Sequence, residues 1–267
     1  MAVTVYKSSD ASAPALTGTA GALSAVIYAC LVTGYGSQSA AGWAREYTGT
    51  NKAVFRAASG NRLHLRVDDT GSTEARIVGY ETMTDVDTGS NPFPTAAQIS
   101  GGLFVRKSNT ADATNRPWLL IANDRIFYML IDSGTSGTDW TVAPVAAGLS
   151  GCFGYGEFLS YKSTTDSYNT IIFGAVVTGV SVGRFAEHAP QNTYSANTGH
   201  YLARNVVATV GAVTCAKSMA LGQSIGAGAM GASSNWGPYP DPVTGGLLIS
   251  PMLVCEAATS GWSVRGI

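Results

Sequence analysis

The sequence predicts a mainly β protein: antiparallel sheets packed in a sandwich-like way, one short N-terminal helix, and long loops rich in Gly and Pro. Charged residues make up only 12% of the 267 residues, whereas long solvent-facing helices need Glu, Lys and Arg on their outer side. Glycine contributes 32 residues, and hydrophobic residues reach 45%. Short apolar runs separated by turn-forming residues recur along the chain, a pattern typical of β-sandwiches.

One segment, residues 20–31, has the periodicity of a helix. Its apolar residues recur every three or four positions, at Leu23, Val26, Ile27, Cys30 and Leu31. Thr19 stands where an N-cap is expected, and Gly34 stands just past the end as a stop signal. A helix this short depends on packing for its stability. We therefore expect its apolar stripe to lie on one face of a sheet.

The other periodic segments are expected to be strands. They are residues 62–67, 118–122, 126–131, 158–161, 168–177, 206–215, 247–254 and 262–265. Apolar and polar residues alternate strictly over the first of them, which indicates a half-buried strand, and residues 68–71 supply a turn. Asn123, Asp124 and Arg125 lie between two apolar runs and predict a hairpin. The strand pattern at the C-terminus is cut short, which leaves open whether the chain continues past Ile267.

Two long segments, residues 187–201 and 222–246, lack periodicity. The first suggests a boundary between a main β domain with the helix (residues 1–180) and a C-terminal β sub-domain (residues 181–267), with a single domain as the alternative. The second is expected to be an arm, because loops of this length are unusual in a compact domain. Met230, Trp236 and Tyr239 are its candidate contacts with another subunit. The alternative is a loop that covers its own sheet.

Charge and cysteine spacing exclude several classes of partner. The net charge is −1 and no run of Lys and Arg exists, so nucleic acid is not an expected partner. No signal peptide and no membrane-spanning apolar run are visible, which predicts no membrane partner and folding in the cytoplasm. The four cysteines (Cys30, Cys152, Cys215 and Cys255) are scattered among apolar neighbours. This spacing predicts buried thiols and no zinc site.

Two motifs in the glycine-rich segment resemble catalytic or nucleotide-binding signatures. Ser224 lies in a Gly-x-Ser-x-Gly pattern, but all three histidines precede it and the residues after it are a poor helix. Residues 226–231 spell Gly-x-Gly-x-x-Gly, but no βαβ unit surrounds them. We expect neither motif to be functional, and we expect no cofactor.

Acidic residues offer two further candidates. Residues 85–91, from Asp85 to Asn91, resemble the start of a calcium loop, but Ala96 stands where the bidentate Glu is expected. An Asx-rich turn that binds its own backbone is the alternative. A glycosidase would need two carboxylates brought together in space. The candidates are Asp68, Asp69, Asp124, Asp132 and Glu157, which are otherwise expected to be solvated turn caps.

Long ordered motifs lie in the N-terminal part of the chain. They are residues 31–37 (LVTGYGS), 41–43 (AGW), 47–53 (YTGTNKA), 65–69 (LRVDD), 75–76, 79–89 (GYETMTDVDTG) and 93–94, with looser matches at 124–128 and 154–158. Together these stretches resemble a group of virion structural proteins of tailed bacteriophages. The resemblance implies a component of the virus particle and transfers no catalytic residue.

The expected function is therefore that of a non-enzymatic virion subunit, assembled in the host cytoplasm beside other virion proteins and copies of itself. A place in the tail, baseplate or fibre attachment is slightly favoured over a capsid decoration or head-fibre protein. A carbohydrate- or receptor-binding module that contacts host-surface glycan is the second class. A glycan hydrolase is the third.

Overall fold

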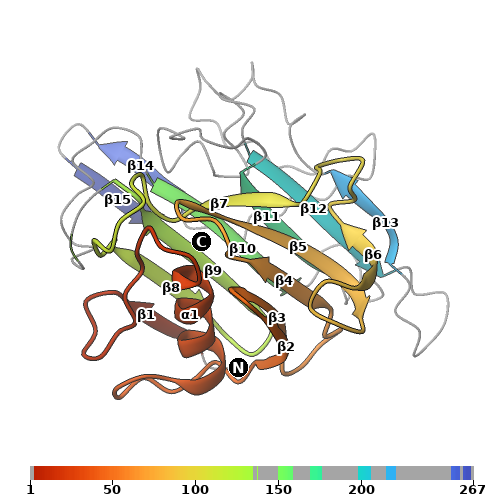
Figure 1. Cartoon of the computed structure of the whole chain (residues 1–267), viewed down its shortest axis with the longest axis horizontal. Coiled ribbons are helices and arrows are strands. Elements are labelled where there is room, and N and C mark those ends of the chain that lie inside the picture. Colours follow the sequence, from red (N-terminus) through yellow and green to blue (C-terminus); the bar gives the residue numbers. More distant parts are fainter. Residues whose placement is uncertain are drawn as a thin grey trace.

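The computed structural model describes residues 3–134, 137, 150–158, 169–175, 198–205, 215–220, 254–258 and 261–265. Its strands are β1 (Thr4–Lys7), β2 (Ala44–Gly49), β3 (Lys52–Arg56), β4 (His64–Asp68), β5 (Glu74–Met83), β6 (Gly89–Phe93), β7 (Leu103–Arg106), β8 (Trp118–Ala122), β9 (Ile126–Asp132), β10 (Ser150–Phe158), β11 (Asn169–Ala175), β12 (Thr198–Asn205), β13 (Cys215–Ala220), β14 (Val254–Ala258) and β15 (Gly261–Arg265). The helical segment is α1 (Ala22–Tyr28), continued by the π-helical turn η1 (Ala29–Thr33). The predicted mainly β class with one short N-terminal helix is confirmed (Figure 1).

Thirteen strands form one antiparallel sheet, and β14 and β15 form a separate hairpin. The main path runs β1-β8-β9-β10-β11-β7-β5-β4-β3-β2, with β6 beside β5, and β12 and β13 continuing from β11. Among the described residues, β7 pairs with β11 through Phe104 and Ala175. The strands on either side of this junction form two halves of the sheet, which curls so that both halves share one core. That arrangement is sandwich-like although the strands are continuous.

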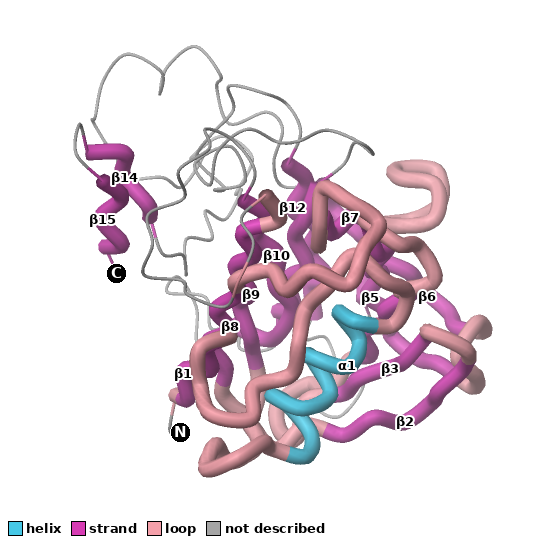
Figure 2. The backbone as a smooth tube through the Cα atoms, turned by 60° about the vertical axis from the view of Figure 1, so that its left-hand side comes forward, coloured by secondary structure: helices cyan, strands magenta, loops and turns pink. Residues whose placement is uncertain are grey.

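Helix α1 lies on the concave side of the curled sheet (Figure 2), and its buried residues belong to the same hydrophobic core as those of the strands. All five residues of the predicted stripe, from Leu23 to Leu31, are fully buried. Gly34 ends the helical segment at φ 76°, where its N–H donates to the carbonyl of Ala29 at 2.8 Å. The predicted packing and stop signal are thus confirmed.

The predicted N-cap is wrong. Residue Gly21, at φ 84°, precedes the helix and offers no side chain, while the Thr19 hydroxyl bonds to Thr17 at 2.8 Å. A carboxylate from another part of the chain replaces the cap: Asp69 accepts the backbone N–H of Ser24 at 3.0 Å. Local sequence cannot reveal this cap, because Asp69 is 45 residues away from Ser24.

The hairpin predicted at Asn123 agrees with the structure. Strands β8 and β9 pair around Asn123, whose side-chain oxygen accepts the N–H groups of Arg125 and Ile126. Strands β10 and β11 also pair with each other, but the strand expected at residues 158–161 overlaps β10 only at Phe158, and residues 159–161 lie outside the described part of the chain. The expected alternation over β4 is also found, with Leu65 and Val67 in the core and Arg66 on the other face.

The far ends of the two halves are held together by Trp43 and by backbone contacts between the β3–β4 and β8–β9 loops. Trp43, just before β2, packs edge-on against Phe127 and Tyr155 of the opposite half. Its indole N–H donates to the carbonyl of Asn123 at 2.8 Å. The backbone N–H of Ala58 donates to the carbonyl of Asp124 at 3.0 Å. These contacts hold the curled sheet closed at the β8–β9 loop.

Several expectations concern residues outside the described part of the chain. The 222–246 segment lies wholly outside it, and so does most of the suggested boundary region. Strand β12 begins at Thr198 and pairs with β11 of the main sheet. The backbone of β15 lies where a C-terminal strand was expected.

Shortening Leu31 to Ala should destabilise the protein by roughly 2–5 kcal/mol, because it leaves a cavity in a closed core. Urea unfolding of Leu31→Ala measures this loss. Val5→Ala is the matched control, since the Val5 side chain is 42% exposed and its loss should change stability little. Equal stability of Leu31→Ala and the parent would contradict the placement of α1 in the core.

Candidate functional site

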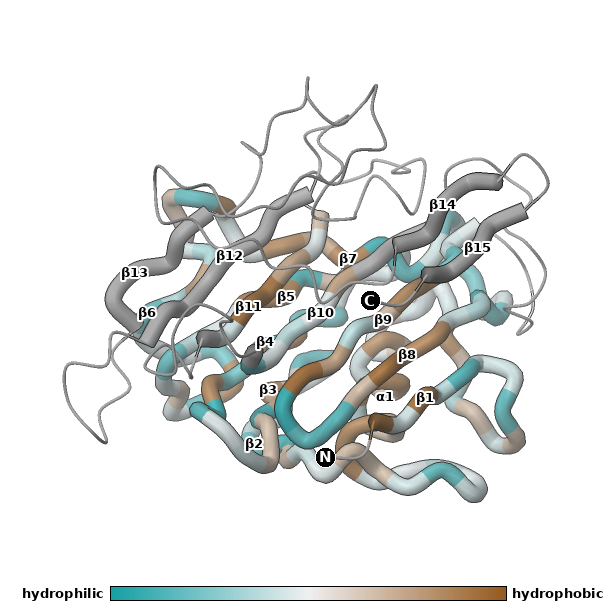
Figure 3. Tube along the Cα trace, turned by 180° about the vertical axis from the view of Figure 1, so that it is seen from behind, coloured by the Kyte–Doolittle hydropathy of each residue, from teal (hydrophilic) through white to brown (hydrophobic). Residues whose placement is uncertain are grey.

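The outer face of β3, β4, β5 and β7 carries a concentration of charged side chains. Successive side chains in a strand point to opposite faces, so core residues such as Leu65 and Ile77 alternate with charged ones. The outward-facing charged residues are Lys52, Arg56, Arg66, Asp68, Glu74, Arg76 and Arg106. In the other half of the sheet, apolar residues mark β8, β9 and β11 in the view from behind (Figure 3). The charged face is therefore the first candidate region for a functional site.

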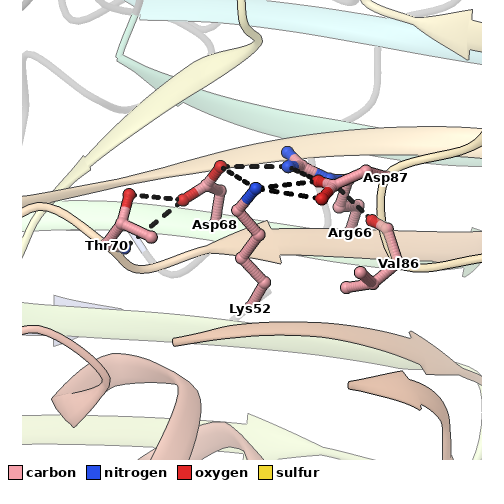
Figure 4. A network of polar contacts seen from close by, with 6 residues as sticks. All are labelled: Lys52, Arg66, Asp68, Thr70, Val86 and Asp87. Atoms are coloured by element: carbon pink, nitrogen blue, oxygen red, sulfur yellow. Dashed lines mark hydrogen bonds and ion pairs between the residues drawn. The ribbon is translucent and has the colours of Figure 1, made fainter. Parts of the chain in front are cut away.

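Three charged residues of this face form one network with Asp87 of the β5–β6 loop (Figure 4). Lys52 Nζ lies 2.9 Å from Asp87 Oδ1 and 3.8 Å from Asp68 Oδ2. Arg66 Nη2 lies 2.9 Å from Asp68 Oδ2, also contacts Asp87, and its Nε donates to the carbonyl of Val86 at 2.9 Å. Hydrogen bonds from Arg66 and Lys52 lower the pKa of Asp87. The network therefore fastens the β5–β6 loop onto β3 and β4.

This arrangement bears on the candidate calcium loop at residues 85–91. Asp87 faces two cations of the protein itself, and Asn91 donates its side-chain amide to Glu81. The N–H of Thr84 donates to the carbonyl of Thr88 at 2.9 Å, which closes the loop on its own backbone. Within the described residues, no three His, Cys, Asp or Glu side chains lie close enough to hold a metal ion. This geometry fits an Asx-rich turn that binds its own backbone better than it fits a calcium loop.

A pocket of about 370 Å³ opens beside the network, between the β4–β5 turn and β7. Its lining residues are Asp68, Thr70, Gly71, Ser72, Thr73, Glu74, Ala75, Arg76 and Phe104. The Arg76 guanidinium lies 3.4 Å from the centroid of the Phe104 ring and donates to the carbonyls of Ser100 and Gly102. Glu74 pairs with Arg106 at 3.1 Å. The lining contains no His or Cys, so it offers hydroxyl and carboxylate contacts rather than an activated nucleophile.

Asp124 and Glu157 are two predicted candidates that influence one another electrostatically. Burial raises the pKa of Glu157, and the charge of Asp124 contributes in the same direction. Glu157 nevertheless accepts the backbone N–H of Asn61 and lies 3.2 Å from Arg125 Nη1, while Asp124 accepts the Ser59 hydroxyl at 2.6 Å. Glu157 is 5% exposed. These carboxylates hold the two sheet halves together at the closed end.

The expectation that all five candidate carboxylates are solvated turn caps is wrong for three of them. Asp69, Asp132 and Glu157 are buried, at 0%, 5% and 5% exposure. Asp132 and Glu157 lie within β9 and β10, and Asp69 directly follows β4, so the sheet itself carries these side chains into the interior. Asp69 meets Lys107 and Ser24, and Asp132 accepts the N–H of Gly134 at 3.1 Å.

The remaining sequence candidates are only partly covered by the described residues. Cys30 is a buried free thiol, as expected, and burial raises its pKa. Ser224, Met230, Trp236, Tyr239 and the 226–231 glycine motif lie outside the described residues. No helix in the described part of the chain is long and apolar enough to cross a membrane.

Comparisons with protein-family models, with curated proteins and with solved structures found no match for this chain. The function must therefore be argued from its own residues.

Sequence reasoning missed Lys107 and Arg116, two buried cations. Nothing in the local sequence Phe-Val-Arg-Lys-Ser distinguishes Lys107 from a solvated lysine at a strand end.

A second polar group on the outer face joins β2 to β4. His64 Nε2 lies 2.8 Å from Glu46 Oε2, its Nδ1 lies 3.3 Å from the carbonyl of Glu81, and Arg56 pairs with Glu46 at 2.8 Å. Burial lowers the pKa of His64; the charge of Glu46 opposes this effect, and that of Arg56 adds to it. His64 therefore stays neutral in the folded protein at a pH where it is protonated in the unfolded chain.

Stability should fall as pH drops below about 6.5, the unfolded pKa of histidine. The unfolded chain then binds a proton that folded His64 binds only at lower pH, so the free energy of unfolding decreases through that interval. Urea unfolding at a series of pH values should give a shallower decrease for His64→Gln than for the parent. The other two histidines are common to both proteins and cancel. Identical slopes in the two proteins would contradict the lowered pKa.

Proposed function

We propose that this chain is a non-enzymatic structural subunit of a tailed-phage virion, placed in the tail, baseplate or fibre-attachment region. The observation that carries the proposal is that three of the candidate acidic residues already form ion pairs within the protein. Asp68, Asp69 and Glu157 are each held by a cation of the protein itself. Groups that would serve as general acids or bases thus hold loops and strands together. This supports a role in architecture.

The sequence resemblance supplies the second support. Its motifs cover the helix end, the β2–β3 hairpin, β4 and most of β5. In the structure these segments build the charged outer face and its network at Lys52, Arg66 and Asp87. The resemblance thus concerns a surface with a defined pattern of paired charges, which a subunit can present to a neighbour.

A capsid decoration or head-fibre protein is the alternative within the same class. The two locations differ in symmetry, because a decoration protein follows the icosahedral lattice and a tail component follows the rotational symmetry of the tail. Copy number in the particle therefore separates them.

A carbohydrate- or receptor-binding module is the second candidate, favoured by the polar pocket beside Asp68 and Glu74. Sugar-binding faces use exposed aromatic rings. Every aromatic side chain whose exposure is described is buried or half-buried, including Phe104 under Arg76. The pocket alone supports this candidate, and a glycan array with Arg76→Ala as control would test it.

Peptides of this chain should be present in washed, gradient-purified phage particles at a fixed copy number. Quantitative mass spectrometry measures that number, and imaging of the particles gives the symmetry. A tail component should match the symmetry of the tail. Particles that retain infectivity and other structural proteins but lack these peptides would contradict the proposal.

A further inference from the structure

Asp69 and Lys107 meet in the interior at a place closed to solvent. Asp69 directly follows β4 and Lys107 directly follows β7, and both side chains are 0% exposed. Lys107 Nζ is in direct contact with Asp69 Oδ1. A primary amine and a carboxyl group are thus held against each other away from water.

The pair also forms hydrogen bonds with backbone groups. Lys107 Nζ donates to the carbonyl of Thr19 at 2.6 Å. The second carboxyl oxygen, Asp69 Oδ2, accepts the backbone N–H of Ser24 at 3.0 Å. The carbonyl orients the amine from one side, and the N–H polarises the carboxyl group from the other.

Burial also favours the neutral form of both groups, because an ion loses its hydration in the interior. It lowers the pKa of Lys107 and raises the pKa of Asp69, although the attraction between the two opposes both changes. A neutral amine has the free electron pair that an ammonium ion lacks, and a neutral carboxylic acid is a better electrophile than a carboxylate.

We propose that Lys107 and Asp69 condense to an intramolecular isopeptide bond that joins the end of β4 to the end of β7. The electron pair of Nζ attacks Cγ and forms the N–C bond, and the Cγ–Oδ1 bond breaks. Oδ1 leaves as water, with its own proton and one proton from Nζ. The reaction needs no oxidant and no co-reactant. Negative charge that develops on Oδ2 in the tetrahedral intermediate is stabilised by the N–H of Ser24.

The product fits the same surroundings. The amide formed keeps one N–H, which can still donate to the carbonyl of Thr19, and one carbonyl oxygen, which still accepts from Ser24. Both buried polar groups of the bond therefore remain hydrogen-bonded, and the charges that were costly to bury are removed. Exclusion of water also protects the bond from hydrolysis.

The bond would close a loop between residues 38 positions apart. A covalent link of this kind restricts the unfolded chain, as a disulfide does, and needs no oxidising environment. It would fasten β4 and β7, which lie on either side of β5 in the sheet, next to the start of α1. This inference does not depend on the proposed virion role.

The intact mass of the purified full-length protein tests the proposal directly. We expect the denatured protein to be lighter than its sequence predicts by the mass of one water molecule. Digestion should yield one branched peptide that joins the segments around Asp69 and Lys107, with no tryptic cleavage after Lys107. Lys107→Met should restore the full mass, whereas Lys52→Met, which removes a surface ion pair, should retain the deficit.

The measurement on the parent protein decides the question even if Lys107→Met fails to fold. A folded parent protein of full mass would overturn the proposal. A mass deficit without the branched peptide, as an aspartyl succinimide would give, would also overturn it.

Discussion

The buried contact between Asp69 and Lys107 is the interaction on which the rest of the structure depends, because it joins three segments that are distant in sequence. The backbone of Asp69 takes part as well: its carbonyl accepts the N–H of Gly21 at 2.9 Å, and its N–H donates to the carbonyl of Asn51 at 2.8 Å. The start of α1, the β2–β3 turn and the ends of β4 and β7 therefore meet at one residue, Asp69. A seven-residue helix is not stable alone in water, so its place in the core requires both this anchor and its apolar stripe.

The second constraint is the closure of the curled sheet. At one side the halves are joined through β7 and β11, where Phe104 pairs with Ala175 among the described residues. At the other side Arg125 links Ser59 to Glu157 through its Nε and Nη1 atoms. Between the two lies a single hydrophobic cluster that includes α1 and residues of both halves. The charged groups at this end thus help to fix the shape of the curled sheet.

Local patterns predicted the elements better than the contacts between them. The helix stripe from Leu23 to Leu31 and the hairpin at Asn123 could be predicted because their determinants lie within a few residues. The N-cap at Thr19 was wrong because the cap comes from Asp69. The burial of Glu157 was missed because its partners Arg125 and Asn61 are distant in sequence and become its neighbours only in the fold. The pocket at Arg76 and Phe104 was also missed, since its two central residues come from strands that only the fold makes neighbours. Long-range polar contacts leave no periodicity in a sequence, and this accounts for most of what sequence reasoning could not supply.

Asp69 and Lys107 act as one unit, whether their contact is ionic or covalent. A double-mutant cycle tests this coupling most directly. The free energy of unfolding in urea is measured for the parent, Asp69→Ala, Lys107→Met and the double variant. Each single replacement leaves one polar group buried alone and should cost about 3–5 kcal/mol. The double variant removes both groups, so its loss should be smaller than the sum of the single losses by more than about 1 kcal/mol. Losses that add within error would contradict the account, since the two side chains would then stabilise the fold independently.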